Sequence, residues 1–173
     1  MRVLIFCVAL FFPCMAQQPR TPDLDAQRAA MKKLAFLVGK WAGEASMLRG
    51  PGEPVVMMQT EEAQYKLDGL LLSIEGVGRN KADGKPVLQA LGIISYDDES
   101  GTYHMRAFNG GRFLETEVKL IDKGMTWGFA LGQYRTSSVL RIDEKGDWTE
   151  VHQITVGTEA SRKFIELSVS RQR

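Results

Sequence analysis

The chain has 173 residues, of which 44% are hydrophobic and 25% are charged, and its formal net charge is +1. This composition is typical of one globular domain and excludes disordered, collagen-like and coiled-coil chains. The charge is near zero and no block of lysine and arginine is present, which argues against a protein that binds nucleic acid.

The first sixteen residues have the pattern of a secretory signal peptide. Arg2 gives a positive start, residues 3–12 are apolar, and Cys14 and Ala16 place small residues at the −3 and −1 positions of a cleavage site. The apolar stretch is too short to span a bilayer, and no later stretch is long enough. We therefore expect cleavage after Ala16 and a secreted or periplasmic protein. A short retained anchor remains an alternative, as does a lipoprotein lipidated at Cys14, although Phe-Phe-Pro before Cys14 fits lipoprotein processing poorly.

Several classes of reactive site are excluded by the residues that remain after cleavage. Both cysteines, Cys7 and Cys14, would be removed, so we expect no disulfide, thiolate metal site or cysteine nucleophile. The two histidines, His104 and His152, lack metal-binding spacing. The chain also contains no Gly-x-Ser-x-Gly motif and no phosphate-binding loop. We therefore predict no catalytic residue and no metal ligand.

One helix is predicted ahead of all the strands. Residues 17–23 contain two prolines and are predicted to be a linker before the domain of residues 24–173. Thr21-Pro22-Asp23 offers a capping hydroxyl, a proline for the first turn and an acid near the positive helix end. Apolar residues then follow at helical spacing until Gly39, which predicts a helix of about fifteen residues.

Beyond Gly39 the pattern changes to short strands separated by turns that contain glycine. Asp68-Gly69 and Asn109-Gly110-Gly111 are examples of these turns, in which glycine supplies the positive φ that tight hairpins need. The predicted strands are residues 41–48, 55–66, 70–79, 86–96, 102–108, 112–121, 125–131, 135–142, 148–156 and 163–171.

Ten short strands joined by tight turns predict an all-β fold in which neighbours along the chain pair antiparallel. An open sheet of this size would expose long edges, and closure removes them. We therefore predict an up-and-down β-barrel of about ten strands with the N-terminal α-helix across one end. A barrel of this size is wide enough for a ligand cavity. A two-sheet sandwich is the alternative.

Ordered motifs along the chain resemble a known group of barrels. The segment from Leu34 to Glu44, with Gly39-Lys40-Trp41 at its centre, resembles the opening of calycin-type barrels. Later pieces resemble the bacterial domain-of-unknown-function family 1579, and the resemblance covers most of residues 34–171. These pieces are Pro51-Gly52, Leu67-Asp68-Gly69, Gly92-Ile-Ile-Ser-Tyr96-Asp97 and Tyr103-His-Met-Arg106. The resemblance implies a lipocalin-like or nitrobindin-like barrel.

The same resemblance assigns structural roles to Gly39, Trp41 and Arg171. In such barrels the glycine lets the chain turn from helix to strand, and the indole fills the closed end. A basic residue at the end of the last strand covers the indole by a cation–π contact and hydrogen bonds. Arg171 occupies that position in the sequence.

The predicted strand 148–156 carries polar and aromatic residues on one face. Trp148, Glu150, His152 and Ile154 alternate along it and therefore point to the same side. If this side faces inward, the carboxylate and imidazole are polar groups in a largely apolar cavity, as in binding sites. If it faces outward, they form a solvated strand face. For His104 we expect an outward orientation, because Tyr103 and Met105 form the more apolar face of its strand.

The function that we predict is binding of a small apolar molecule in the barrel, which we favour over an enzymatic role without excluding one. Trp148, Glu150 and His152 are candidate binding residues, and adaptable apolar walls would come from Trp127, Met105 and Met57. Other candidate wall residues are Met58, Met125, Phe113 and Phe129.

Two alternatives remain open. The first is a haem protein in which His152 ligates the iron. The resemblance argues against this, because nitrobindin-like barrels carry the ligating histidine on the last strand, and here that strand has none. The second is a structural or envelope protein with a packed barrel interior.

Overall fold

The computed structural model describes residues 20–48, 50 and 52–173, and the predicted signal peptide and its cleavage site lie outside these residues. An α-helix, α1 (Leu24–Met31), continues into a 3₁₀ helix, η1 (Lys32–Leu37). The strands are β1 (Gly39–Met47), β2 (Val55–Lys66), β3 (Leu71–Asn80), β4 (Pro86–Asp97), β5 (Thr102–Asn109), β6 (Arg112–Ile121), β7 (Gly124–Trp127), β8 (Ala130–Leu131), β9 (Tyr134–Ile142), β10 (Trp148–Val156) and β11 (Arg162–Arg171).

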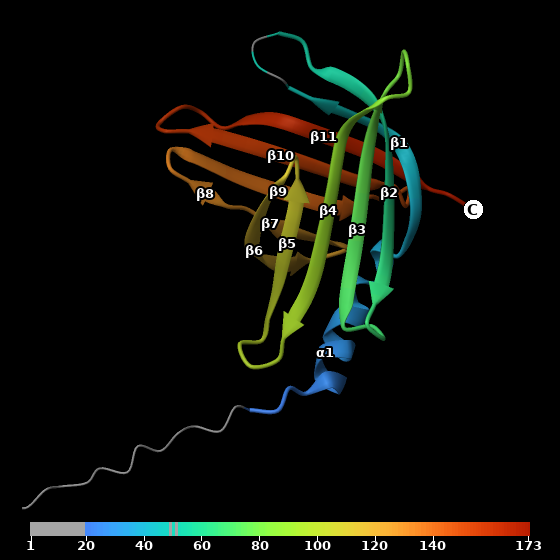
Figure 1. The fold of residues 1–173 in the computed structure, drawn as a ribbon, viewed down its shortest axis with the longest axis vertical. Coiled ribbons are helices and arrows are strands. Elements are labelled where there is room, and N and C mark those ends of the chain that lie inside the picture. The colour runs from blue at the N-terminus through green and yellow to red at the C-terminus, as the bar shows by residue number, and fades with distance from the viewer. Residues whose placement is uncertain (1–19, 49, 51) are drawn as a thin grey trace, which may run out of the picture.

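The strands form a closed antiparallel barrel (Figure 1). Neighbours along the chain pair from β1 to β7, then β7 pairs with β9, β9 with β10 and β10 with β11. The pairing of β11 with β1, in which Trp41 lies opposite Arg171, closes the ring. The predicted fold class, an all-β barrel of about ten strands with an N-terminal helix, is confirmed, and the sandwich alternative is wrong.

One predicted strand is broken in the structure. Residues 125–131 form β7 and the two-residue β8, which pairs only with β9. Side chains replace the regular ladder at the break, because the Thr116 hydroxyl donates to the carbonyl of Gly128 at 2.6 Å and the N–H of Phe129 donates to the Thr136 hydroxyl at 3.2 Å. Threonine hydroxyls that bond to the backbone in this way compete with strand pairing.

The helix differs from the prediction at both of its ends. Its N-cap is Asp23 and not Thr21: the Asp23 carboxylate accepts from the N–H groups of Asp25 and Ala26 at 3.1 and 2.9 Å. A carboxylate there also interacts favourably with the positive end of the helix dipole. The α-helix has 8 residues rather than about fifteen, and η1 replaces its second half. In a 3₁₀ helix residues three apart share a face, which turns both Leu34 and Leu37 into the core.

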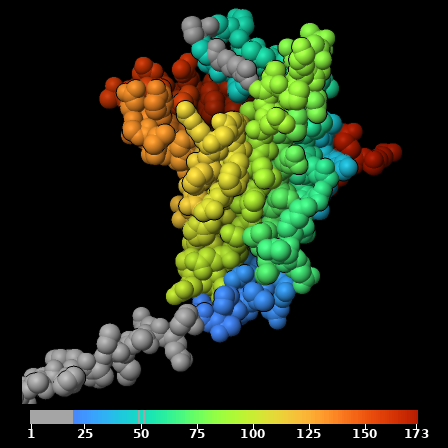
Figure 2. Space-filling model, viewed as in Figure 1, coloured from blue at the N-terminus to red at the C-terminus, as the bar shows by residue number. Residues whose placement is uncertain are grey.

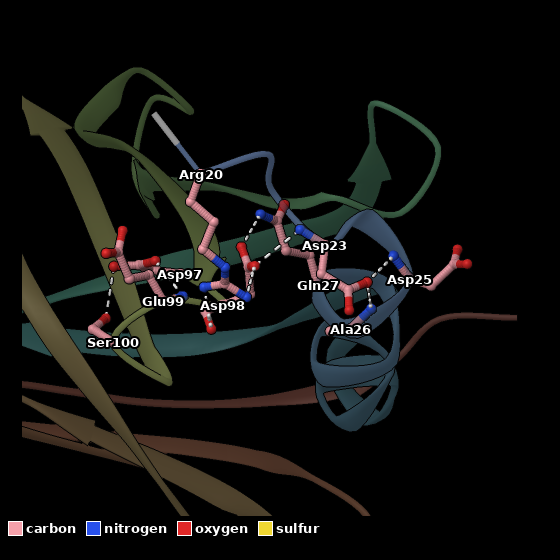
Figure 3. Close-up of polar contacts among 9 residues, drawn as sticks. All are labelled: Arg20, Asp23, Asp25, Ala26, Gln27, Asp97, Asp98, Glu99 and Ser100. Atoms are coloured by element: carbon pink, nitrogen blue, oxygen red, sulfur yellow. Dashed lines mark hydrogen bonds and ion pairs between the residues drawn. The ribbon is translucent and has the colours of Figure 1, made fainter. Parts of the chain in front are cut away.

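Part of the predicted linker is attached to the barrel (Figure 3). Asp98, in the turn between β4 and β5, accepts hydrogen bonds from the Gln27 side chain at 2.7 Å and the Asp23 N–H at 2.9 Å. The Arg20 guanidinium lies 3.1 Å from the same carboxylate. These contacts, the Gln27 hydrogen bond above all, hold the pKa of the Asp98 carboxyl below its usual value. The chain is therefore fixed to this turn from Arg20 onward.

The helices close the lower end of the barrel (Figures 1 and 2). Met31, Leu34 and Leu37 are fully buried against the inner face of the strands. Two tyrosine hydroxyls anchor the backbone of α1: Tyr103 donates to the carbonyl of Ala30 at 2.8 Å and Tyr65 to that of Met31 at 2.9 Å. Within the described part of the chain, no helix is long and apolar enough to cross a membrane.

Candidate functional site

The barrel encloses a cavity of about 310 Å³, within the usual range for small-molecule sites. Since the β4–β5 turn lies against α1, β5 runs away from the closed end. The cavity reaches Asn109 and Arg112 at the far end of β5 and start of β6, and therefore extends toward the end of the barrel opposite the helix. Its walls are largely apolar and include Ile74, Met105, Leu114, Met125, Phe129 and Leu140.

Strand β10 turns its polar and aromatic face into this cavity. Trp148, Glu150 and His152 all line it, which decides between the two orientations left open by the sequence. The indole N–H of Trp148 donates to Oε2 of Glu150 at 3.1 Å, and Nε2 of His152 lies 2.5 Å from Oε1 of Glu150. On the neighbouring strand β9, the Ser138 hydroxyl lies 2.8 Å from Nδ1 of His152. These contacts link the three β10 side chains to one another and to Ser138.

A second carboxyl enters the cavity from β2. Glu61 is 7% exposed, and its Oε1 accepts from Nε2 of Gln59 at 2.7 Å. Burial in the barrel, reinforced by the nearby charge of Glu150, raises the pKa of Glu61 to about 8, while the Gln59 hydrogen bond acts in the opposite direction. Glu61 is therefore mainly a neutral acid at pH 7. Gly76 on β3 makes room for it, because a Cβ at Gly76 would lie 2.7 Å from Oε2 of Glu61.

Gln59 leaves one polar atom without a partner. The residue is 2% exposed, and its Oε1 is buried and accepts no hydrogen bond. Among the described residues, every other buried side-chain oxygen or nitrogen has a hydrogen-bond partner. This oxygen lies on the inner face of the barrel over Gly78, where a Cβ would come within 2.8 Å of it. A buried acceptor of this kind costs about 1–3 kcal/mol when nothing donates to it. We call Gln59, Glu61 and Glu150 the acceptor cluster.

An irregularity in β11 completes the wall around His152. The pairing of β10 with β11 shifts after His152, so that Phe164 is an extra residue between the partners Ile165 and Lys163. As a result Phe164 and its neighbour Ile165 both line the cavity. The rings of Trp127 and Phe164 meet the imidazole edge to face at centroid distances of 5.7 and 5.8 Å.

The predicted wall residues divide into three groups. Trp127 and Met105 line the cavity, as do Met125 and Phe129. Met57 is fully buried in the core beside the cavity, packed over Gly78. Met58 and Phe113 are 47% and 65% exposed, so their prediction as wall residues is wrong. Alternation along β2 turns Met58 outward because Met57 points inward, and Phe113 packs outside the barrel on Phe108 and under Arg106. His104 is exposed.

Sequence reasoning missed Gln59 and Glu61. Polar residues occur on both faces of β2, so alternation does not mark them as inward. Two signals in the sequence could have marked them as inward. Ala63, a small apolar residue, lies on the same face of β2 as Gln59 and Glu61. The paired strand β3 also carries two glycines, Gly76 and Gly78, directly opposite them. Glycines on one face in mid-strand often mark the close approach of a large neighbour.

The residues around His152 do not fit haem ligation. Ligation needs a ring nitrogen free to bind iron. Nδ1 of His152 is engaged by Ser138 and Nε2 by Glu150, and His152 is the one histidine among the lining residues. In the described ranges, no group of three His, Cys, Asp or Glu side chains could hold a metal ion.

The closed end of the barrel is built around Trp41. Its indole N–H donates to the carbonyl of Leu37 at 2.8 Å, and the Arg171 guanidinium lies 4.2 Å from the centre of its ring. Arg171 also donates to the carbonyls of Val38 and, at 2.8 Å, Phe36. Gly39, with φ of +134°, permits this arrangement, because a Cβ there would lie 2.6 Å from Nη1 of Arg171.

Comparison with known proteins identifies the fold. No family model matches the sequence, and no curated protein matches it either. Among solved structures, the crystal structure of Rv2717c from M. tuberculosis is similar, with a TM-score of 0.64 and 16% identity over 83% of this chain and 98% of that chain. Identity this low shows the fold alone. The antiparallel barrel fold that the sequence motifs imply is confirmed, and the resemblance to calycin-type barrels and to family 1579 stays a prediction.

Proposed function

We propose that this protein binds a small, largely apolar molecule inside its barrel. The observation that carries the proposal is the cavity of about 310 Å³, whose apolar walls surround a few polar side chains. Small-molecule sites commonly have this composition, in which apolar walls supply affinity and a few polar groups fix orientation. A barrel with a purely structural role would gain dispersion energy by filling the same space with larger side chains.

Blocking the cavity tests the proposal. Ala90 on β4 lines the cavity, whereas the adjacent Gln89 is exposed on the outer face. We expect the wild-type protein to bind an apolar fluorescent dye with quenching of its tryptophan emission. Ala90→Phe places a ring in the cavity and should weaken dye binding about tenfold or more, a loss of about 1.4 kcal/mol or more, because the ring occupies volume that the dye needs. The matched control, Gln89→Phe, adds the same ring outside and should bind the dye as the wild type does.

Two results of this titration would contradict the proposal. Equal dye affinity in the wild type and in Ala90→Phe would place the dye on the outer surface, and the absence of any binding would favour the packed-barrel alternative. Haemin is the second probe. A Soret band of ligated haem that is lost in His152→Ala would support the haem alternative, whereas the contacts of His152 predict no such band.

A further inference from the structure

The acceptor cluster contains a buried hydrogen-bond acceptor that a purely apolar ligand would leave without a donor. Gln59 presents a buried carbonyl oxygen with no donor, and Glu61 presents a carboxyl beside it. Glu150 lies close enough for its charge to act on Glu61. Gln59 and Glu150 accept hydrogen bonds, as does Glu61 once it has ionised. The Trp148 indole already donates to Glu150, and the Gln59 amide donates one N–H to Glu61.

One carboxyl of the cluster also has no ion-pair partner. The titratable side chains that line the cavity are Glu61 from β2, Arg112 from β6, and Glu150 and His152 from β10. Glu150 and His152 lie 2.5 Å apart and interact with each other. Arg112 is the first residue of β6, next to the β5–β6 turn. Among the described residues Glu61 forms no ion pair, and its one hydrogen bond comes from the neutral Gln59 amide, so a cation beside it would meet no competing charge.

We propose that the acceptor cluster binds the head group of a small amphipathic primary amine, whose ammonium group donates to Oε1 of Gln59 and to the Glu61 carboxyl. The apolar part of the molecule then lies against Met105, Met125 and Trp127. An ammonium group has three donors and a positive charge, which match the unpartnered oxygen of Gln59 and a carboxylate at Glu61. A carboxylate head group would be repelled by Glu150 and would leave Gln59 without a donor. This inference rests on the proposed function, because it names the chemistry of the molecule in the same cavity.

Binding of the amine is expected to release a proton. The empty site holds Glu61 mainly protonated at pH 7, since its pKa is raised to about 8. The bound ammonium stabilises the carboxylate, so the Glu61 proton passes to the buffer when the complex forms. An alkylamine, like lysine, keeps its own proton up to about pH 10. Affinity for the amine should therefore rise between about pH 6 and about pH 8.

Three probes with the same chain and different head groups test the proposal: octylamine, octanol and octanoate. Titration calorimetry of the full chain at pH 7 should show octylamine binding about tenfold more tightly than octanol, with octanoate weakest. Repeating the octylamine titration in two buffers of different ionisation enthalpy should show proton release, whereas octanol should release none.

A matched pair of variants locates the head group. Glu61→Gln keeps the size and neutrality of the protonated acid but cannot become a carboxylate, so octylamine should bind about tenfold more weakly and octanol unchanged. Glu62→Gln is the control, because Glu62 lies on the outer face of the same strand, 3.8 Å from Lys40. Both octylamine and octanol should bind Glu62→Gln as they bind the wild type.

The outcomes separate the two proposals. Equal affinities for octylamine and octanol, or octylamine binding that Glu61→Gln leaves unchanged, would overturn the ammonium site and leave the apolar cavity intact. Tighter binding of octanoate than of octylamine would also overturn it. If none of the three probes binds, the proposed function fails together with this inference.

Discussion

We expect Trp41→Ala to lower the free energy of unfolding by about 3–5 kcal/mol, the usual cost of truncating a large buried aromatic side chain. Trp41 is 2% exposed and meets the ring of Trp148 edge to face at a centroid distance of 5.6 Å. Its truncation would leave a void between the helix and the strands and would remove the donor to the Leu37 carbonyl. Urea unfolding monitored by far-UV circular dichroism measures the loss.

Arg171→Ala, alone and combined with Trp41→Ala, tests whether Arg171 covers the indole of Trp41. The cation–π contact of Arg171 with Trp41 should contribute about 0.5–1 kcal/mol, so Arg171→Ala should be less destabilising than Trp41→Ala. Because the two side chains touch, the double variant should lose less than the sum of the single losses, by about 0.5–2 kcal/mol. Lys40→Ala is a control on the solvent face of β1 and should leave stability almost unchanged. Additive losses would contradict the role of Arg171 as the cover of the indole.

Glu61→Gln should change the pH dependence of stability more than any other single carboxyl replacement. The pKa of Glu61 is about 8 in the folded protein and near its ordinary value of 4.5 when the chain is unfolded. The folded state therefore binds the proton more tightly, and this group destabilises the fold as pH rises from about 4.5 to about 8. A shift of this size corresponds to roughly 4–5 kcal/mol between the two limits, since each pKa unit is about 1.4 kcal/mol.

The variant lacks the ionisation and should escape this loss. Unfolding free energies measured from about pH 5 to about pH 9 should converge for the wild type and Glu61→Gln at the acidic end and diverge above it, with the variant more stable. Glu62→Gln, which replaces a half-exposed carboxyl on the outer face of the same strand, should follow the wild type. Parallel pH profiles for all three proteins would contradict a buried neutral acid at position 61.

Strand and turn chemistry in the sequence was sufficient to predict the barrel. The predicted strands 112–121 and 148–156 have the bounds of β6 and β10, because alternation and glycine turns both mark their ends. The break after β7 was not predictable in the same way. It depends on hydroxyls of Thr116 and Thr136 that reach the backbone from neighbouring strands, and such contacts between distant residues leave no local pattern.

The candidate site was predictable only in part. The period of two grouped Trp148, Glu150 and His152 on one face of β10, but the mixed character of that face did not show its direction. Closure of the barrel determines the direction, since it turns Trp148 toward Trp41 at the closed end. The carboxyl of Glu61 was missed because its burial is made possible by Gly76 on the paired strand.

The most direct test of a ligand-accessible cavity uses the three tryptophans of the chain. Trp127 and Trp148 line the cavity, whereas the indole N–H of Trp41 is bound to Leu37 beneath it. In a ¹H–¹⁵N NMR titration with octanol, the indole signals of Trp127 and Trp148 should shift in a saturable way, and that of Trp41 should shift least. Indole signals that stay fixed while backbone amides on the outer surface shift would contradict binding inside the barrel.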